Sequence, residues 1–327
     1  MTEMNPALDR ILTLELARVT ERAAVAATHM RGKGNEKAAD QLAVDAMRRE
    51  LNALDIDGVV VIGEGERDKA PMLFIGEEVG TKNGPKVDIA LDPLEGTTLC
   101  AKNKPNSLAV LAMAIGGTLL HAPDVYMNKI AIGGQYDADV IDLDDTPTQN
   151  LTRLAKAKGC AVSDLGVCIL DRERHQDLIA EVRATGAAIM LIDDGDIAGV
   201  IATVDPEKTG VDIYIGVGGA PEGVLAAAAL RCIGGHMQAR LQTDSQSQKD
   251  RAAEMGVVDF DKKLSIRDMA RGDVIFSATG VTDGDMLFGV RMKGNKIETE
   301  TLVMRSTTGT VRRIIAEHYK LEKFAMD

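Results

Sequence analysis

The 327-residue sequence has few aromatic side chains: five Phe, four Tyr and no Trp. Proteins that bind single-stranded nucleic acid usually stack bases on aromatic rings, so this scarcity argues against that function. A net charge of −12 argues against any nucleic-acid partner, because the overall field repels a phosphate backbone. An acidic protein that acts on an anionic substrate needs metal cations to reconcile the two charges, which directs attention to its carboxylates.

The four cysteines are widely separated and form no CxxC pair. Together with five scattered histidines, they give neither a zinc-finger spacing nor a disulfide framework. The sequence also lacks an apolar signal peptide at its start and any run of 18 apolar residues, so no membrane span is expected. A reducing cytoplasm is therefore the expected location.

The length and the change in pattern near residue 150 predict two domains of α/β class, residues 1–150 and 151–327. Apolar residues at helical spacing predict a helix over residues 8–26, and Asn35 is the expected N-cap of a second helix that ends near Leu54. A largely antiparallel sheet follows, with expected strands at 59–62 and 87–92 and a hairpin over 108–120. Pro93 is expected to end the second strand, because it cannot donate to a ladder.

The second half alternates short apolar strands with helical segments, which predicts a parallel α/β arrangement. The expected strands are residues 167–170, 188–192 and 211–217. The expected helices are residues 177–184, 197–202 and 223–232.

Acidic residues occur at the ends of several predicted elements, where side chains from different segments can converge. Five of them form the candidate metal site: Asp40, Glu64, Asp92, Glu95 and Glu222. Clustered carboxylate oxygens are the usual ligands of hard divalent cations. Each acid taken alone is more simply a helix cap or a solvated turn residue, so the prediction depends on the combination.

A second group of residues is of the type that binds phosphate and sugar. Arg172, Arg174 and His175 follow a predicted strand, and arginine binds phosphate through two parallel hydrogen bonds. A solvated basic patch at a helix start is the alternative. Residues 193–196 (DDGD) follow the next strand and would bind sugar hydroxyls or cap a helix. A dinucleotide-binding GxGxxG at residues 216–221 fails, because Pro221 stands where the last glycine is required.

Six short motifs resemble the class II fructose-1,6-bisphosphatases, which belong to the lithium-sensitive sugar/inositol phosphatase superfamily. In chain order they are IGEGE (62–66) with APM (70–72), DIALDPLEGT (88–97), APDVYM (122–127), DGD (194–196), GGAPEG (218–223) and FSATG (276–280). They run through nearly the whole chain. DPxxGT alone marks the superfamily, whereas IGEGE and GGAPEG together indicate the class II branch.

The resemblance implies a layered αβαβα sugar-phosphatase fold and hydrolysis of the 1-phosphate of fructose 1,6-bisphosphate in gluconeogenesis. It implies Mg²⁺ or Mn²⁺ as cofactor, held by the same five acids, with Thr97, Glu64 and Asp92 in catalysis. It also implies a homo-oligomer, either a dimer or a tetramer. The implied substrate contacts are Glu95, Gly96, Thr97, Tyr126, Arg172, Glu173, Arg174, Asp194, Gly195, Asp196 and Gly219.

One segment departs from the family pattern. Before the first metal-ligand helix the family reads G-K/R-G-D/E-K-N, whereas this chain has GKGNEK at residues 32–37, with Glu36 at the lysine position and Lys37 one residue later. The alternatives that stay open are activity on sedoheptulose 1,7-bisphosphate, alone or in addition, activity on inositol phosphates, and a nucleotide- or metal-binding regulatory module without turnover.

Overall fold

The computed structural model describes residues 8, 10–65, 72–243 and 245–325. The chain divides into two compact units. The first consists of Met1–Leu119 and Gly272–Asp327, and the second of Leu120–Arg271. The boundary expected near residue 150 falls inside helix α4 (Pro147–Lys158) of the second unit. The assignment of metal binding to residues 1–150 and of substrate binding to 151–327 stays a prediction.

The first unit contains an eight-stranded mixed sheet in the order β12-β13-β11-β4-β3-β1-β2, with β14 on the other side of β13. Only β1 and β3 pair in parallel, and the other described pairs are antiparallel. Its strands are β1 Asp57–Ile62, β2 Glu78–Val79, β3 Lys86–Glu95, β4 Leu108–Ile115, β11 Val274–Gly280, β12 Arg291–Lys293, β13 Lys296–Arg305 and β14 Thr310–His318.

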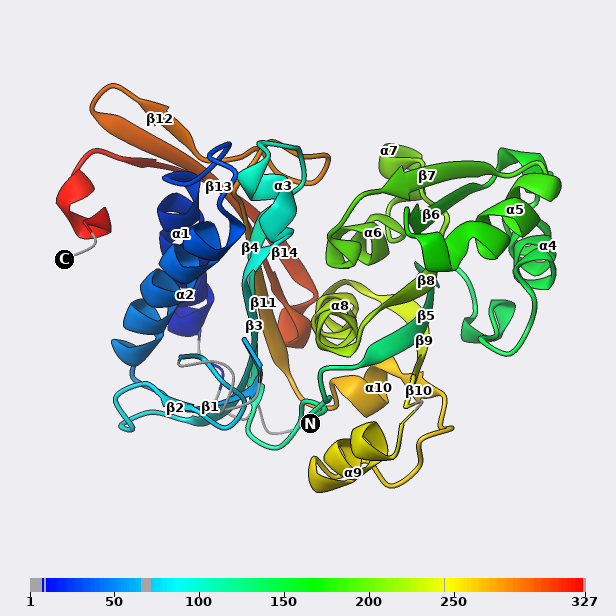
Figure 1. The fold of residues 1–327 in the computed structure, drawn as a ribbon, viewed down its shortest axis with the longest axis horizontal. Coiled ribbons are helices and arrows are strands. Elements are labelled where there is room, and N and C mark those ends of the chain that lie inside the picture. The colour runs from blue at the N-terminus through cyan, green and yellow to red at the C-terminus, as the bar shows by residue number, and fades with distance from the viewer. Residues whose placement is uncertain (1–7, 9, 66–71, 244, 326–327) are drawn as a thin grey trace. The chain divides into compact units, whose positions relative to one another are not determined.

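Two long helices, α1 (Arg10–Thr28) and α2 (Glu36–Asn52), lie side by side against one face of this sheet (Figure 1). Both were predicted from helical periodicity, and the expected N-cap is confirmed because the side chain of Asn35 accepts a hydrogen bond from the backbone of Ala38. Their apolar faces and the facing side chains of the sheet form one buried core. That core includes Leu16, Met47, Leu51, Ile89, Leu91 and Ile275.

Two local predictions in this unit are wrong. Strand β3 continues through Pro93 to Glu95, and the pairing with β4 shifts register between Asp92 and Glu95 so that the proline is accommodated at a bulge. No hairpin forms over residues 108–120, because β4 pairs with β3 on one side and with β11 on the other. The partner β11 is more than 150 residues later in the chain, so the local turn signal at the two glycines was misleading.

The second unit contains a six-stranded mixed sheet in the order β10-β9-β5-β8-β6-β7. Parallel pairing holds for β6 with β7 and β8, whereas the described pairs of β5, β9 and β10 are antiparallel. The parallel prediction is therefore right for the three strands that it named and does not extend to the others. The strands are β5 Tyr126–Gly133, β6 Gly166–Leu170, β7 Ala188–Ile192, β8 Ile213–Gly219, β9 Gly235–Leu241 and β10 Leu264–Ser265.

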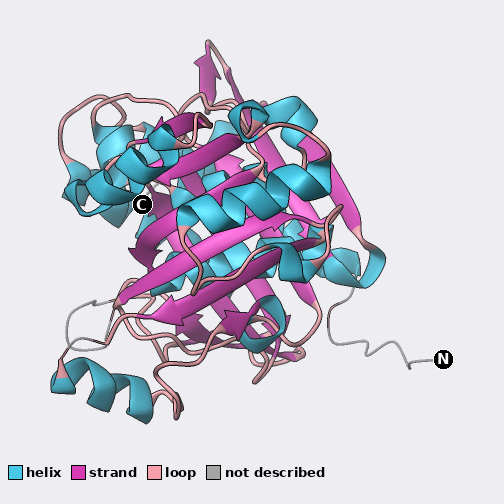
Figure 2. Ribbon diagram, turned by 90° about the vertical axis from the view of Figure 1, so that its right-hand side faces the viewer, coloured by secondary structure: helices cyan, strands magenta, loops and turns pink. Residues whose placement is uncertain are grey.

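Helices lie across the strands of the second unit, as the view in Figure 2 shows. Its core includes Ile130, Ile132, Leu151, Val167 and Ile213. The longest helix, α8, is rich in alanine and largely buried. Besides α4, the helices are α5 Gln176–Ala184, α6 Asp196–Ala202, α7 Pro206–Thr209, α8 Ala220–Ile233, α9 Gln246–Glu254 and α10 Ile266–Met269.

The two mixed sheets with their helices confirm the mixed α/β class. Within the part of the chain that the structure describes, no helix combines the length and the apolar character needed to cross a bilayer.

Candidate functional site

Two of the predicted metal ligands, Asp92 and Glu95, lie close together at the end of β3. Residues three apart on a regular strand point to opposite faces, but the bulge between these two turns the strand locally. A carboxylate oxygen of Asp92 consequently lies within 4.8 Å of one of Glu95. The backbone N–H of Leu94 donates to Asp92 Oδ1 (3.0 Å), which holds the turn. The misjudged proline is thus part of what brings the two acids together.

Asp40, on the second turn of α2, belongs to the same cluster. Burial, followed by the nearby negative charge of Asp92, raises the pKa of its carboxyl group to about 6. A bound divalent cation would relieve the repulsion between these carboxylates. Carboxylate oxygens are also the ligands that Mg²⁺ and Mn²⁺ prefer. The residues present in the first unit therefore fit a hard divalent cation.

Glu64 follows β1, and its backbone is held by a hydrogen bond from its N–H to the carbonyl oxygen of Leu73 (3.0 Å). The glycine at position 63 is required by this close approach, because a Cβ atom there would lie 2.1 Å from the same carbonyl oxygen. The side chain of Glu64 is half-buried. Glu66, Ala70 and Pro71 of the neighbouring motifs lie outside the described residues.

Gly96 and Thr97 form the start of the short helix α3 (Thr97–Ala101). Gly96 is its N-cap in the left-handed conformation (φ 76°), and a Cβ atom there would lie 2.8 Å from Leu99 Cδ1. The residue must therefore be glycine for both conformational and steric reasons. The Ser107 hydroxyl donates to the carbonyl oxygen of Glu95 (3.1 Å) and fixes the strand end. Thr97 is half-buried directly after these residues.

The segment that departs from the family pattern is bound to α3. The backbone N–H groups of Gly32 and Gly34 donate to the carbonyl oxygens of Cys100 and Ala101, both at 2.9 Å. The Thr98 hydroxyl donates to Glu36 Oε1 (2.8 Å). Glu36 therefore ties the start of α2 to the residue after Thr97, a contact that sequence reasoning missed. In the sequence, only the departure of residues 32–37 from the family pattern pointed to this contact.

In the second unit, Arg174 and Tyr126 come together from η3 (Glu173–His175) and the start of β5. The guanidinium carbon lies 4.7 Å from the centroid of the exposed tyrosine ring, which is a cation–π contact. Arg174 also donates twice to the carbonyl oxygen of Val217 (3.1 and 2.7 Å). Arg172 Nη2 pairs with Asp194 Oδ1 at 3.2 Å. Four predicted substrate-binding residues of this unit thus form two pairs, Arg174 with Tyr126 and Arg172 with Asp194.

His175 does not serve as a phosphate ligand, contrary to the sequence-based expectation. The ring is buried, its Nε2 accepts from the backbone of Val217 (2.8 Å), and its Nδ1 lies 2.7 Å from the carbonyl oxygen of Leu170. These partners require the neutral tautomer with the proton on Nδ1. Burial also lowers the pKa of His175. The residue instead connects the ends of β6 and β8.

Asp196 lies in a buried polar network with two residues that sequence reasoning missed. Its carboxylate forms an ion pair with Lys129 and accepts a hydrogen bond from the Tyr214 hydroxyl (3.0 Å). Lys129 Nζ also donates to the carbonyl oxygen of Gly219 (3.0 Å). In the sequence, a lysine within the apolar run of β5 could have indicated this network. This network positions the loop that carries Asp194 and Gly195, while a direct sugar contact by Asp196 stays a prediction.

Glu222 lies in the first turn of α8, after Pro221 at the helix start. A Cβ atom on Gly219 would lie 1.9 Å from Glu222 Oε2, so the glycine leaves the room that this half-buried carboxylate occupies. Gly219 and Glu222 therefore depend on each other locally. Glu173 is exposed at the start of η3.

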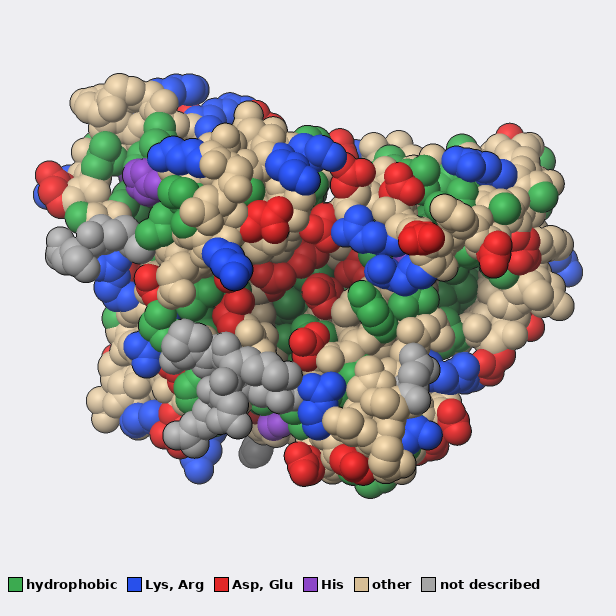
Figure 3. All heavy atoms as spheres, viewed as in Figure 1, with side chains coloured by type: hydrophobic (Ala, Val, Ile, Leu, Met, Phe, Trp, Pro, Cys, Tyr) green, Lys and Arg blue, Asp and Glu red, His purple; other side chains and the backbone are tan. Residues whose placement is uncertain are grey.

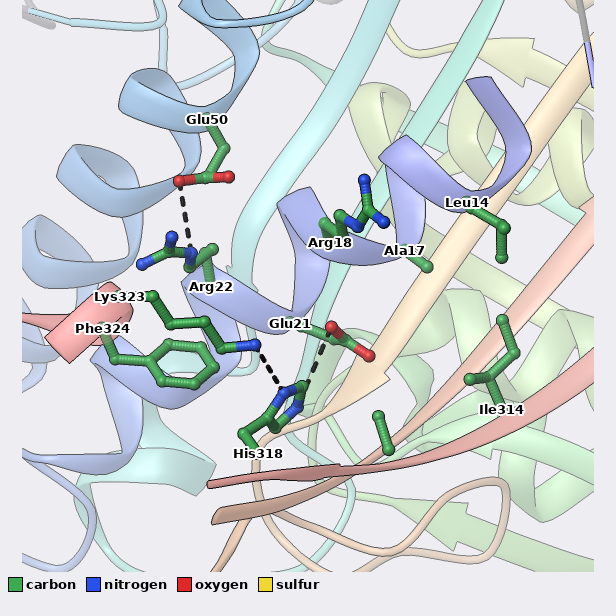
Figure 4. A pocket seen from close by; sticks show the side chains of 11 residues that line it. Leu14, Ala17, Arg18, Glu21, Arg22, Glu50, Ile314, His318, Lys323 and Phe324 are labelled. Carbon is green, nitrogen blue, oxygen red and sulfur yellow. Dashed lines mark hydrogen bonds and ion pairs between the residues drawn. The ribbon is translucent and has the colours of Figure 1, made fainter. Parts of the chain in front are cut away.

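The first unit also has a cavity of about 360 Å³, lined by α1, the end of α2, β14 and the C-terminal segment (Figure 4). The lining includes none of the predicted site residues. Its side chains are Leu14, Ala17, Arg18, Glu21, Arg22, Glu50, Ile314, Ala316, His318, Lys323 and Phe324.

Hydrogen bonds link the polar groups of this cavity to one another. Lys323 Nζ lies 2.8 Å from His318 Nδ1, His318 Nε2 lies 3.0 Å from the Thr299 hydroxyl, and that hydroxyl donates to Glu21 (3.3 Å). Burial, followed by the positive charges of Lys323 and Arg22, lowers the pKa of His318 to about 4. The neutral imidazole can therefore accept from Lys323, and the network fastens the C-terminal segment to α1.

Acidic and basic side chains are interspersed over the face of each unit that Figure 3 shows. Where the chain is described, lysine and arginine occur on this face in small separate groups, many of them beside acidic residues.

Comparisons with known proteins agree over nearly the full chain. The family model described as bacterial fructose-1,6-bisphosphatase, glpX-encoded, matches residues 10–318. A protein of Synechococcus sp. (strain JA-3-3Ab), named D-fructose 1,6-bisphosphatase class 2/sedoheptulose 1,7-bisphosphatase, is 45% identical over 338 residues, covering 96% of this chain and 97% of that one. A protein of the same name from Synechococcus sp. (strain CC9902) is 43% identical over 327 residues, with the same coverage.

Among solved structures, one described as an extragenic suppressor from Pyrococcus furiosus superimposes with a TM-score of 0.30. It is 12% identical and covers 60% of this chain and 70% of that one.

Proposed function

Because the chain belongs to the glpX-encoded bacterial fructose-1,6-bisphosphatase family, we propose that it hydrolyses the 1-phosphate of fructose 1,6-bisphosphate. The products are fructose 6-phosphate and inorganic phosphate. The observation that supports this most directly is the cluster of Asp40, Asp92 and Glu95, because a phosphatase needs positive charge at the reacting phosphate and these acids suit the cation that brings it.

The proposed cofactor is Mg²⁺ or Mn²⁺, with five acids as ligands: Asp40, Glu64, Asp92, Glu95 and Glu222. When bound, such a cation supplies charge that stabilises the anionic transition state of phosphate hydrolysis. The contribution of the chain is to hold the carboxylates in place. In the first unit, the bulge of β3 and the close approach of Gly63 to the carbonyl oxygen of Leu73 hold these carboxylates in place.

Thr97 is the proposed orienting residue for the attacking water. A threonine hydroxyl can accept a hydrogen bond from water and align it for in-line attack, and Glu64 and Asp92 are proposed to assist as acids of the same catalytic group. The backbone of Gly96 approaches closely because it lacks a side chain. Arg172 and Arg174 are proposed to hold the phosphate that is not hydrolysed, since guanidinium groups bind phosphate through paired donors.

The remaining proposed contacts complete the sugar-binding side. Tyr126 presents an exposed ring against Arg174, so it can pack on the substrate and limit the movement of the arginine. Asp194 and the backbone of Gly195 and Gly219 are proposed to bind sugar hydroxyl groups. Glu173 and Asp196 are retained as proposed contacts on the resemblance alone.

A phosphate-release assay with Mg²⁺ and Mn²⁺ tests the proposal. The panel contains fructose 1,6-bisphosphate, sedoheptulose 1,7-bisphosphate and inositol 1-phosphate. Fructose 1,6-bisphosphate is expected to be hydrolysed well, and turnover of none of the three substrates would contradict the proposed function. Sedoheptulose 1,7-bisphosphate is the second candidate because both relatives carry that activity in their names. Its preference by tenfold or more in kcat/KM would replace the first choice.

Variants separate the proposed roles. Asp92→Ala and Glu64→Ala are expected to abolish turnover and to weaken Mn²⁺ binding measured by calorimetry, since each removes a carboxylate ligand. Thr97→Ala is expected to bind Mn²⁺ normally and to lose at least about 100-fold in kcat, as general positioning of a reactant predicts. Glu254→Gln, which changes an exposed acid on α9, is the matched control and should retain both properties. Normal kcat for Thr97→Ala would remove the threonine from the mechanism.

We further propose that the protein acts in gluconeogenesis in a reducing cytoplasm and assembles as a homo-oligomer. The cysteines suit that location: burial raises the pKa of the Cys100 thiol to about 11 and that of Cys168 to about 12, so both stay protonated. Cell fractionation with an antibody tests the location, and recovery in the membrane or extracellular fraction would contradict it.

A further inference from the structure

Strand β14 forms an edge of the sheet of the first unit. Over the described residues it pairs with β13 alone. It is nine residues long and contains no proline. Long exposed edges present unpaired backbone groups, so proteins usually shorten or interrupt them unless another strand binds there. The length and regularity of β14 therefore require an explanation.

Three large apolar side chains lie on one side of this edge. Val311 and Ile315 alternate along β14 and are 49% and 60% exposed, and Tyr319, directly after the strand, is 63% exposed. Residues of the same parity on a strand share one face, so these three side chains form an apolar row. Few other large apolar side chains among the described residues are exposed to this extent.

Two opposite charges alternate with the apolar row on the same face. Arg313 donates to Glu300 Oε1 (2.7 Å) and to the carbonyl oxygen of Met286 (2.8 Å). Glu317 pairs with Lys296 and accepts from the Tyr319 hydroxyl (2.6 Å). Both side chains are therefore held in place on the face, yet both remain exposed. The edge presents, in order, an apolar group, a positive charge, an apolar group, a negative charge and an apolar group.

We propose that β14 binds β14 of a second copy of this chain, antiparallel across a twofold axis at Ile315, so that the two sheets become continuous. A twofold axis perpendicular to a sheet keeps each face on its own side, so residues that oppose one another must have the same parity. With the axis at Ile315, each Arg313 opposes Glu317 of the second copy. Ile315 opposes Ile315, and Val311 opposes Tyr319. In this register, apolar side chains oppose apolar side chains, and each positive charge opposes a negative charge.

Neighbouring registers lack this complementarity. With the axis at Ile314, Arg313 would oppose Ile315 and Val311 would oppose Glu317. With the axis at Arg313, two arginines would oppose each other. Like charges that face each other directly across strands are destabilising. In the register at Ile315, Arg312 opposes His318 on the other face, and this histidine is neutral near pH 7 because its pKa is lowered to about 4.

Sedimentation velocity on the full-length protein tests the association. Arg313→Glu should raise the dimer dissociation constant by about tenfold or more, because each of two symmetric charge pairs becomes repulsive. Glu317→Arg alone should have the same effect. The double variant Arg313→Glu with Glu317→Arg restores opposite charges in both pairs and should regain most of the affinity. Met292→Lys, at an exposed apolar position on β12, is the control and should associate as the unchanged protein does, because β12 pairs with β13 and lies outside the proposed interface.

Cysteine substitution tests the register. Ile315→Cys should form a reducible covalent dimer under mild oxidation, whereas Ile314→Cys and Arg313→Cys should not, because only a residue on the axis meets its own copy. Circular dichroism confirms that each variant is folded. The proposal is overturned by an unchanged protein that is monomeric at tens of micromolar, by association that none of the charge variants weakens, or by cross-linking at residue 313 or 314 in place of 315.

Discussion

Replacing Lys129 by methionine removes the positive charge of a buried ion pair while it keeps most of the side-chain length. The side chain of Lys129 is 0% exposed and that of its partner Asp196 is 3% exposed. The ammonium group also donates to the carbonyl oxygen of Gly219. In the variant, Asp196 keeps the hydroxyl of Tyr214 as its partner but loses the positive charge of the Lys129 ammonium group.

Removal of one member of a buried ion pair usually destabilises a protein by about 3–5 kcal/mol, because the remaining charge stays desolvated. A domain of this size changes its melting temperature by about 2–4 °C for each kcal/mol, so Lys129→Met should melt about 6–20 °C lower. The effect should appear in the second unit, to which both residues belong. Replacing both charges, as Lys129→Met with Asp196→Asn, should restore part of the loss because no unpaired charge remains.

Urea unfolding followed by circular dichroism, together with scanning calorimetry, measures this difference. The matched control is Lys262→Met, which breaks a hydrogen-bonded pair with Asp268 at 2.6 Å on the surface. Surface pairs contribute about 0–1 kcal/mol, so this variant should be close to the unchanged protein. If Lys129→Met unfolds within about 1 kcal/mol of the control, the reasoning from burial is refuted.

Three further predictions concern local geometry and pH. Gly218→Ala should destabilise the protein in thermal unfolding, because its Cβ would lie 2.1 Å from a carboxylate oxygen of the buried ion pair, whereas Gly216→Ala on the same strand meets only ordinary contacts at 3.4 Å and should be tolerated. The pKa of His318 is lowered from 6.5 to about 4, so the unfolded chain binds a proton there that the folded chain does not. Stability should therefore fall as the pH decreases through that window, by up to about 1.4 kcal/mol per pH unit, and His318→Gln should make the slope shallower in urea unfolding at a series of pH values. Glu36→Ala and Thr98→Val remove the same hydrogen bond, so a double-mutant cycle should give a coupling free energy of about 0.5–1.5 kcal/mol, and simple additivity would contradict the contact.

Much of the local structure could be predicted from the sequence, because burial of one face leaves a periodic record. Helices α1 and α2 and strand β7 occur where apolar spacing predicts them, and the side chain of Asn35 caps α2 as expected. Pro93 was wrongly expected to end the strand because proline has no backbone N–H to donate. A proline can nevertheless lie within a strand at a bulge, where the regular pairing is interrupted. The same bulge then explains why Asp92 and Glu95 approach each other.

The candidate site was predictable in its chemistry and only partly in its contacts. Oxygen ligands and arginines could be named from residue type, but the roles of Lys129 and Glu36 could not, because each acts through a partner distant in the chain. His175 shows the converse error. Its position after a strand suggested that it binds phosphate. In the structure, its two ring nitrogens instead form hydrogen bonds with backbone groups at the ends of two different strands.

The sequence by itself determined the mixed α/β class, the two leading helices and the acidic character of the candidate metal site, since these depend on residue type and on spacing within one segment. The tertiary structure alone decided that β11–β14 join the sheet begun by β1–β4, that Lys129 neutralises Asp196, and that β14 lies at an edge with its apolar row exposed. The physical reason is that periodicity records which face of an element is buried but not which distant element covers it. Strand order and the pairing of buried charges depend on the free energy of the whole packed unit.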